Sequence, residues 1–404
     1  MDLSLTEEHQ AIRALAADFV DREVVPNATA WDRAEAVDRA VVKRLGDLGF
    51  LGMTVPEEYG GVGGDHLAYC LVMEELGRGD TAMRGIVSVS LGLVTKPILI
   101  HGTEAQKQQW IPRLVAGEAL GCFGLTEPGN GSDAGHLKTR ATRDGDDWLI
   151  SGTKLFITNG TWADLALIFA RTGANTGAST GASTGTDTET EDTAPDPGPR
   201  GITAFLVPTD TPGFQAREIK GKLGLRGQAT AELILDGVRV PDSARLGEVG
   251  QGFKIAMSTL DKGRMSVAAG CVGLIQACLD ASVTYAKQRD QFGKTIAHYQ
   301  LVQEMLADMS VDLDAGRLLV WRVADLIERG LPYATAASTA KLFCSEAAVR
   351  AANNAIQVFG GYGYIDEYPV GKYLRDARVL TLYEGTSQIQ KLLIGRALTG
   401  VSAF

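Results

Sequence analysis

The chain has 404 residues, of which 45% are hydrophobic, and its 39 basic and 49 acidic side chains give a formal net charge of −10. This length exceeds what one ordinary hydrophobic core accommodates, so two or three packed units are expected. The acidic balance argues against a nucleic-acid-binding surface. The five cysteines and five histidines show no CxxC or HExxH spacing, which predicts buried free thiols and no metal site.

The N-terminal segment, from Leu5 to about Gly117, has helical periodicity. Thr6 and Thr103 stand directly before glutamate-containing turns in LTEEHQ and GTEAQKQQW, which is typical of capped helices. The opening MDLSLTEEHQ lacks the basic start and apolar core of a signal peptide, and no apolar run of membrane-spanning length is apparent. A cytoplasmic protein that does not enter a membrane is therefore expected.

The central segment changes to the alternating pattern of strands near Gly121. Asp144-Gly145 separates two strand-like runs, as in a hairpin, and the runs LALIFAR, ITAFLVP, FQAREI and AELILDGVRVP follow. Residues 172–199 are low-complexity and almost devoid of large apolar side chains, which predicts a disordered loop. The segment as a whole predicts an antiparallel β unit.

The last segment, after Pro241, returns to strong helical periodicity. Val272, Ile275 and Leu279 begin one apolar stripe, and a second runs through the following helix, as in a helical bundle. The sequence therefore predicts an α+β multidomain protein. Its expected parts are an N-terminal α-helical domain at 1–120, a middle antiparallel β domain at 121–240 and a C-terminal four-helix-bundle-like domain at 241–404.

Several short segments contain residues suited to a ligand. GLTEPGNGSDAGH (124–136) combines glycines that let backbone N–H groups approach a ligand with small hydroxyl donors. KLFITNG (154–160) could present an aromatic ring and a hydroxyl to a flat heterocycle. RDQFGK (289–294) and QVFGGYGY (357–364) offer an arginine, glutamines and paired glycines to a phosphate and a ring. Each segment alone is equally well explained as a turn or an element end.

One more segment, LYEGTSQIQ (382–390), places a glutamate and a glycine between two helix-like runs. Together and in this order, GLTEPGNGSDAG, KLFITNG and QVFGGYGYIDEYPVGKYLRDARVLTLYEGTSQIQ resemble the signatures of the acyl-CoA dehydrogenase family of flavoproteins, across essentially the whole chain. The resemblance implies FAD-dependent α,β-dehydrogenation of an acyl-CoA to a trans-2-enoyl-CoA. Glu384 matches the base that takes the α-proton while a hydride leaves Cβ for flavin N5. Some branches place this base on a helix, where this chain has Gly263.

The resemblance also implies the binding residues. Tryptophan is common in the family where Phe156 stands, a mild departure because either ring can pack on a flavin. FAD would contact Phe123, Leu125, Thr126, Ser132, Phe156 and Thr158, and Thr386 and Gln388 would close the site. A neighbouring subunit would contribute Arg289, Gln291, Phe292, Gln300, Gln357, Gly360 and Gly361 to the same FAD. The acyl-CoA would meet Ser132, Arg84, Asp261, Arg264 and Gly385, although Asp261 is equally well explained as a surface charge.

Partners and substrate follow from the same resemblance. Electrons would pass to an electron-transfer flavoprotein, and a homotetramer is the family norm. A short or branched-chain acyl-CoA is the expected substrate, and a glutaryl-CoA-type substrate whose distal carboxylate meets Arg84 is the alternative. Arg84 could instead pair with a neighbouring acid or face a subunit. An acyl-CoA oxidase, a flavin monooxygenase (disfavoured by the glutamate) and a non-enzymatic scaffold or CoA-binding adaptor are further alternatives.

Overall fold

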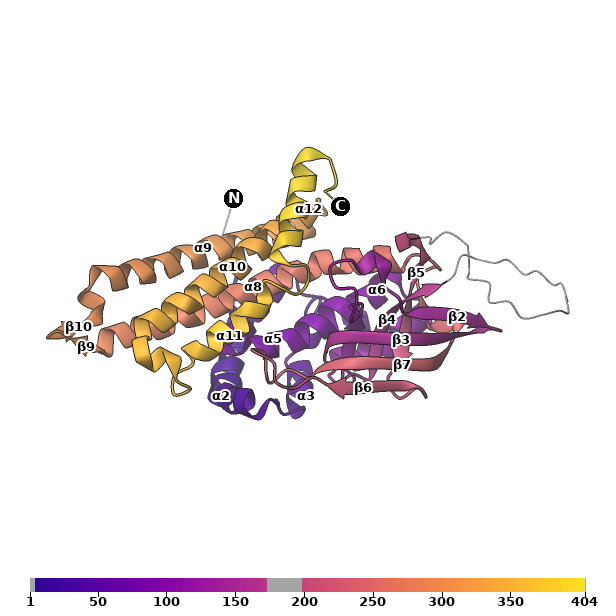
Figure 1. Ribbon diagram of the computed structural model, residues 1–404, viewed down its shortest axis with the longest axis horizontal. Coiled ribbons are helices and arrows are strands. Elements are labelled where there is room, and N and C mark those ends of the chain that lie inside the picture. Colours follow the sequence, from indigo (N-terminus) through magenta and orange to yellow (C-terminus); the bar gives the residue numbers. More distant parts are fainter. Residues whose placement is uncertain (1–3, 173–197, 404) are drawn as a thin grey trace.

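The computed structural model describes residues 4–172 and 198–403. Helices, a β-sheet and further helices follow one another along the chain, as the sequence predicts (Figure 1). The sheet lies at one end of the molecule, and the long C-terminal helices extend from it to the other end. The low-complexity loop expected at 172–199 lies outside the described residues except for its first residue and its last two.

The N-terminal helices begin at the expected caps. The hydroxyl of Thr6 accepts from His9 N at 3.2 Å, and Thr103 forms a complete capping box with Gln106. Two π-helical stretches, Val20–Val24 and Ser88–Thr95, join neighbouring α-helices and have no counterpart in the sequence analysis. The α-helices of this part are α1 Glu7–Phe19, α2 Val25–Ala34, α3 Ala40–Asp47, α4 His66–Gly79, α5 Thr81–Val87, α6 Lys96–His101 and α7 Glu104–Val115.

The central sheet contains all the strands that the sequence predicts, in the order β6-β7-β3-β2-β4-β5-β8 with β1 beside β4. The predicted hairpin joins β2 to β3, and Gly145 in its turn has φ +63°. The sheet is not wholly antiparallel, because β1 and β2 both run parallel to β4. The strands are β1 Gly121–Gly124, β2 Arg140–Asp144, β3 Asp147–Thr158, β4 Leu165–Thr172, β5 Ile202–Pro208, β6 Phe214–Glu218, β7 Thr230–Pro241 and β8 Arg245–Leu246.

Strand β4 shows how the sheet joins the rest of the core. Leu165, Leu167 and Phe169 belong to the large hydrophobic cluster that also contains the N-terminal and C-terminal helices. The alternate residues Ala166 and Ile168 belong to a second cluster on the other face of the sheet. Because successive strand side chains point to opposite faces, a continuous apolar run such as LALIFA is expected of a strand buried on both sides.

The C-terminal helices form an elongated bundle. The long helix α8 packs against α9, α10 and, from the N-terminal part, α4. At the end of the bundle far from the sheet, a small hairpin of β9 Asp290–Gln291 and β10 Lys294–Thr295 connects α8 to α9 (Figure 1). The helices are α8 Gly252–Gln288, α9 Gln300–Glu328, α10 Ala334–Phe359, α11 Val370–Leu380 and α12 Ser387–Thr399.

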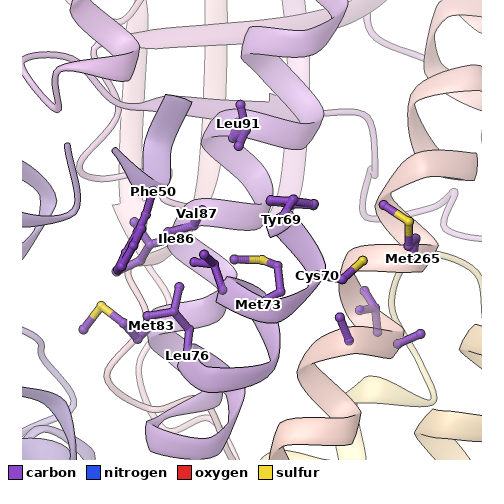
Figure 2. Packing of buried hydrophobic residues seen from close by; sticks show 14 of the residues in the cluster. Phe50, Tyr69, Cys70, Met73, Leu76, Met83, Ile86, Val87, Leu91 and Met265 are labelled. Atoms are coloured by element: carbon purple, nitrogen blue, oxygen red, sulfur yellow. The ribbon is translucent and has the colours of Figure 1, made fainter. Parts of the chain in front are cut away.

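Glycines set the close crossing of α4 and α8. A Cβ at Gly273 would lie 1.8 Å from the carbonyl oxygen of Glu74, and one at Gly77 would lie 2.4 Å from that of Gly270. Around this crossing, Tyr69 and Cys70 of α4 lie toward Met265 of α8, while further side chains of α4 and α5 fill the space toward Phe50 (Figure 2). Bulkier residues would push α8 away from α4 and α5, and so would disturb the candidate site built on them.

Two helical runs have the length and hydropathy of a membrane span, Thr81–His101 and Gly252–Gln288. No run of this length was expected from the sequence. Of their most apolar windows, 78% and 67% are buried inside the protein, so these runs form its core. All five cysteines are buried and free, as predicted. Within the described residues, no group of three or more His, Cys, Asp and Glu side chains could hold a metal ion.

Candidate active site

The turn between α11 and α12 holds Glu384. Its backbone is left-handed, with φ +50°, and Gly385 follows with φ +88°. A Cβ at residue 385 would also lie 2.5 Å from Nε2 of Gln390, so both conformation and space call for glycine. The turn directs the Glu384 carboxylate inward: a Cβ at Gly263 of α8 would lie only 2.2 Å from its Oε2. Oε2 is buried and has no hydrogen-bond partner among the described residues.

The environment of Glu384 combines burial with positive charge. Burial raises the pKa of the Glu384 carboxyl above its ordinary value, because a desolvated carboxylate is disfavoured. The cations of Arg84, Lys341 and Arg264 act against this rise. A raised pKa makes the Glu384 carboxylate a stronger proton acceptor than an exposed glutamate, which suits a general base.

Arg84, on α5, is 1% exposed and lies beside this turn. Its Nη2 donates to the hydroxyl of Tyr383, and its Cζ lies 5.7 Å from the centroid of the same ring. Its stem packs on Gly270, where a Cβ would meet Nε at 2.9 Å. In the described part of the chain no carboxylate lies within ion-pair distance of Arg84, and its Nε has no acceptor. The pairing with a neighbouring acid that the sequence analysis considered is therefore replaced by the contact with Tyr383.

Of the other predicted substrate contacts on α8, Arg264 lies near Glu384. Arg264 is buried, forms an ion pair with Asp261 and places its Nη1 3.5 Å from Oγ of Ser338. Asp261 itself is partly exposed, and burial raises the pKa of its carboxyl while Arg264 opposes the rise. Arg264 thus contributes to the charge around Glu384, whereas Asp261 holds Arg264 in place.

Two of the predicted FAD-binding segments are held together by a buried ion pair that the sequence analysis missed. Lys154, 0% exposed, places its Nζ 2.8 Å from Oε1 of Glu127 and 3.2 Å from the carbonyl of Leu125. Glu127 also accepts from the backbone N–H and the hydroxyl of Thr139, at 2.8 and 2.6 Å. The pair fixes GLTEPG against KLFITNG, and Leu155 N donates to Thr126 O at 2.9 Å beside it.

We expect Lys154→Met to lower the free energy of unfolding by about 3–5 kcal/mol, because it leaves the buried carboxylate of Glu127 without its cation. Burial alone would raise the pKa of Glu127, and it is chiefly Lys154 that holds it below the ordinary value. Denaturant unfolding, with Lys138→Met as the exposed-lysine control, measures the effect. Equal unfolding midpoints for the two variants would show that the pair does not stabilise this junction.

The predicted flavin-facing residues lie along these two segments. Phe156 is 65% exposed and has φ +60°, an unusual backbone for an aromatic residue, so the chain displays this ring to the outside. Thr158 Oγ1 lies 3.5 Å from Oε1 of Gln228. Phe123 packs on Phe169 with ring centroids 4.9 Å apart. The side chain of Leu125 is buried in the core, so any ligand contact of this residue comes through its main chain, whereas Ser132 is exposed.

The remaining predicted FAD residues form a separate group at the far end of the bundle. A cavity of about 450 Å³ is lined there by Arg289, Gln291, Gly360 and Gly361, and the guanidinium of Arg289 lies 5.5 Å from the ring centroid of Tyr362. Gln300 begins α9, and the exposed residues Phe292 and Gln357 belong to the same end. Arg289 lies about 39 Å beyond Gly263 along α8 at about 1.5 Å per residue. One chain therefore does not bring this group to Glu384.

Thr386 and Gln388 flank the turn on the side of α12. Thr386 caps this helix, its hydroxyl accepting from Ile389 N at 3.2 Å, and Gln388 is exposed. Two residues that hold the turn from inside, Lys341 and Gln390, were not predicted from the sequence. Lys341 could have been noticed, because it is a lone lysine in the small-residue run ATAASTAKLF.

Known proteins are similar to this chain over nearly its whole length. Family models described as the N-terminal, middle and C-terminal domains of acyl-CoA dehydrogenase match residues 6–118, 122–238 and 250–399. The short-chain specific acyl-CoA dehydrogenase of Bos taurus mitochondria is 43% identical over 97% of this chain and 90% of that protein.

Three solved structures are similar over nearly their whole length. Butyryl-CoA dehydrogenase from Megasphaera elsdenii has a TM-score of 0.91 and 40% identity, covering 98% of this chain and 100% of that one. A structure described as the electron transferring flavoprotein of Acidaminococcus fermentans has a TM-score of 0.91 and 40% identity, covering 99% of this chain and 100% of that one. A glutaryl-CoA dehydrogenase from Mycobacterium smegmatis in complex with FADH2 has a TM-score of 0.90 and 38% identity, covering 99% of this chain and 96% of that one. The chain therefore belongs to the acyl-CoA dehydrogenase family and is an FAD-dependent oxidoreductase.

Proposed function

We propose that this acyl-CoA dehydrogenase converts a short or branched-chain acyl-CoA to its trans-2-enoyl-CoA, with Glu384 as the base that removes the α-proton. The observation that carries the proposal is the buried Oε2 of Glu384, which has no partner among the described residues and a raised pKa. A carboxylate that only stabilised the fold would be paired, because a buried unpaired charge is costly. This oxygen is free to accept a proton from a substrate.

In the proposed reaction, a proton and a hydride leave neighbouring carbons of the acyl chain. The α-proton passes to the Glu384 carboxylate, and the electron pair of that bond forms the new double bond as the β-hydrogen departs. FAD, when bound, supplies the acceptor for that hydride. The surrounding cations of Arg84, Lys341 and Arg264 favour the ionised form of Glu384 and so oppose the effect of its burial.

The residues present fit FAD if two subunits share its binding. Phe156 and Thr158 offer a displayed ring and a hydroxyl, and a Cβ at Gly129 or Gly131 would meet nothing within 4 Å, so the glycine loop has room for a ligand. The group around Arg289 lies too far along α8 to serve the same chain's Glu384. It would hold the other end of the FAD of a neighbouring subunit, in keeping with the proposed homotetramer.

A panel of thioesters tests the reaction. Under anaerobic conditions, butyryl-CoA and isobutyryl-CoA are expected to bleach the visible absorbance of the bound flavin and to yield the 2-enoyl product, identified by mass spectrometry. A protein purified without flavin, or one that no acyl-CoA bleaches, would instead be the non-enzymatic adaptor considered from the sequence.

The reoxidation of the flavin separates two enzyme classes. We propose an electron-transfer flavoprotein as the acceptor, supported by the similarity to the structure described under that name. An acyl-CoA oxidase would instead release hydrogen peroxide in air at the rate of substrate consumption, so peroxide release is compared with reduction of an electron-transfer flavoprotein.

Arg84 raises a second candidate substrate, a glutaryl-type dicarboxylyl-CoA. Its burial without a carboxylate partner in the described residues would suit the distal carboxylate of such a substrate. With a short or branched acyl chain as substrate, Arg84→Ala is expected to lower kcat/KM for butyryl-CoA and glutaryl-CoA by the same factor, because the loss acts through Tyr383 and Glu384. A fall about 100-fold larger for glutaryl-CoA would establish the dicarboxylyl substrate, since truncating one partner of a buried charge pair costs a few kcal/mol. Arg84→Lys is the charge-retaining control.

A further inference from the structure

Lys341 lies deep inside the bundle, next to the turn that carries Glu384. It is on α10, 0% exposed, and its Nζ donates to the carbonyl oxygen of Gly385 at 2.8 Å. An ammonium has three N–H donors, and no other acceptor and no carboxylate lie within bonding distance of this one among the described residues. Burial lowers the pKa of Lys341 to about 8, which shows that its charge is held at a cost.

Two side chains, Lys341 and Gln390, donate hydrogen bonds to the peptide carbonyls of the turn. Nε2 of Gln390 donates to the carbonyl oxygen of Glu384 at 3.1 Å and to that of Gly385 at 3.0 Å. The Gly385 oxygen therefore receives one charged and one neutral donor. Glu384 has a left-handed backbone, which is unfavourable for a residue with a side chain unless its surroundings impose it.

We propose that Lys341 is a positioning residue for Glu384: its buried ammonium holds the Gly385 carbonyl, fixes the left-handed turn and so aims the carboxylate past Gly263 into the site. This inference rests on the proposed role of Glu384 as the base. Lys341 acts twice, because its hydrogen bond sets the direction of the side chain and its charge favours the ionised form of Glu384. Gln390 also hydrogen-bonds the turn, but it is neutral and so does not favour the ionised form of Glu384.

Other groups also face this pair, and they stay constant when Lys341 is replaced. Burial raises the pKa of Tyr69 and Tyr383 further above their ordinary, already alkaline values, and that of Cys271 to about 12, so none of the three titrates near pH 7. The groups concerned come from several elements: Tyr69 of α4, Arg84 of α5, Arg264 and Cys271 of α8, Glu346 of α10, and Tyr383.

Proton removal can be measured without dehydrogenation. An acyl-CoA whose Cβ carries no hydrogen, such as tert-butylacetyl-CoA, can lose an α-proton to Glu384 and regain a deuteron from D₂O, but it has no hydride to give. The rate of deuterium uptake at Cα, followed by mass spectrometry over a range of pH on the FAD-loaded protein, therefore reports the base alone.

Lys341→Met is expected to slow this exchange at least about tenfold on the acidic side of the profile and to move the profile to higher pH, because loss of the cation raises the pKa of Glu384. The difference from the parent protein should shrink as pH rises above about 8, where Lys341 of the parent loses its own charge. Lys341→Arg restores a cation and is expected to return the profile toward that of the parent. Gln390→Leu is expected to slow the exchange at every pH without moving the profile.

The outcomes separate this inference from the proposed function. If Glu384→Gln exchanges as fast as the parent, Glu384 is not the base and the proposed function fails. If Glu384→Gln is inactive but Lys341→Met and Lys341→Gln keep the parent pH profile and rate, with only a lower unfolding temperature, Lys341 is structural and the inference is overturned. Lys341→Gln decides the matter if the methionine variant does not fold, because it keeps a donor and loses the charge.

Discussion

Glu384→Gln is expected to slow reduction of the bound flavin by an acyl-CoA by about 10²–10⁴-fold, the usual contribution of a general base. Glutamine retains the size and burial of the side chain but does not accept the α-proton. In the parent protein, the rate should rise with pH as Glu384 loses its proton, and the rise should lie above the ordinary glutamate range because burial raises this pKa. The glutamine variant should lack this rise. Anaerobic stopped-flow absorbance measures both quantities.

The control for this substitution is Glu367→Gln, an exposed glutamate that precedes α11. It removes the same charge from the same part of the chain and should leave the rate and its pH dependence unchanged. FAD content is measured for both variants, since a loss of cofactor would imitate a loss of the base. A Glu384→Gln protein that retains FAD and reduces it at the parent rate would refute the assignment of Glu384.

Gly263→Ala is expected to lower the rate of flavin reduction by about 100-fold while leaving the fold intact. The new methyl group would lie 2.2 Å from Oε2 of Glu384 and 3.1 Å from Cδ2 of Leu93, so the carboxylate has to move. A displacement of about 1 Å at a reacting group commonly costs this much. Alanine is also a better helix former than glycine by about 0.5–1 kcal/mol, so α8 itself is not weakened.

Gly395→Ala provides a matched control, because Gly395 also lies within a helix, α12, and a Cβ there would meet nothing within 4 Å. Both substitutions increase helix propensity by the same amount. They differ in whether the new methyl group contacts the carboxylate of Glu384. Equal rates for Gly263→Ala and Gly395→Ala would mean that the Glu384 carboxylate does not lie against α8 in solution.

Much of the fold could be predicted from the sequence because its signals are local. Thr6 and Thr103 cap helices through bonds to residues three positions away, and Gly145 supplies the positive φ of a hairpin turn. The β4 run LALIFA indicates a strand buried on both faces. Its parallel pairing with β1 and β2 was missed, because the direction of a neighbouring strand depends on the path of the chain between them and not on the strand's own residues.

The candidate site was predictable only in part, for the same reason. The motifs marked Glu384, Phe156 and Arg289 as residues of interest, and only the family resemblance assigned the third to a neighbouring subunit, because nothing in the local sequence separates it from the first two. The length of α8 does so: it places Arg289 about 39 Å from Gly263. Only in the folded chain do Glu127 and Lys154, 27 residues apart in sequence, form a buried ion pair.

The sequence by itself determined the kinds of elements, their order, and the glycine that allows a left-handed turn after Glu384. Each of these depends on the conformational preference of a few consecutive residues. The tertiary structure decided where the carboxylate lies, because its burial against Gly263 and its cations, Arg84, Arg264 and Lys341, come from three helices. Desolvation and charge act through space, so the properties that make this glutamate a candidate base exist only once those helices have packed.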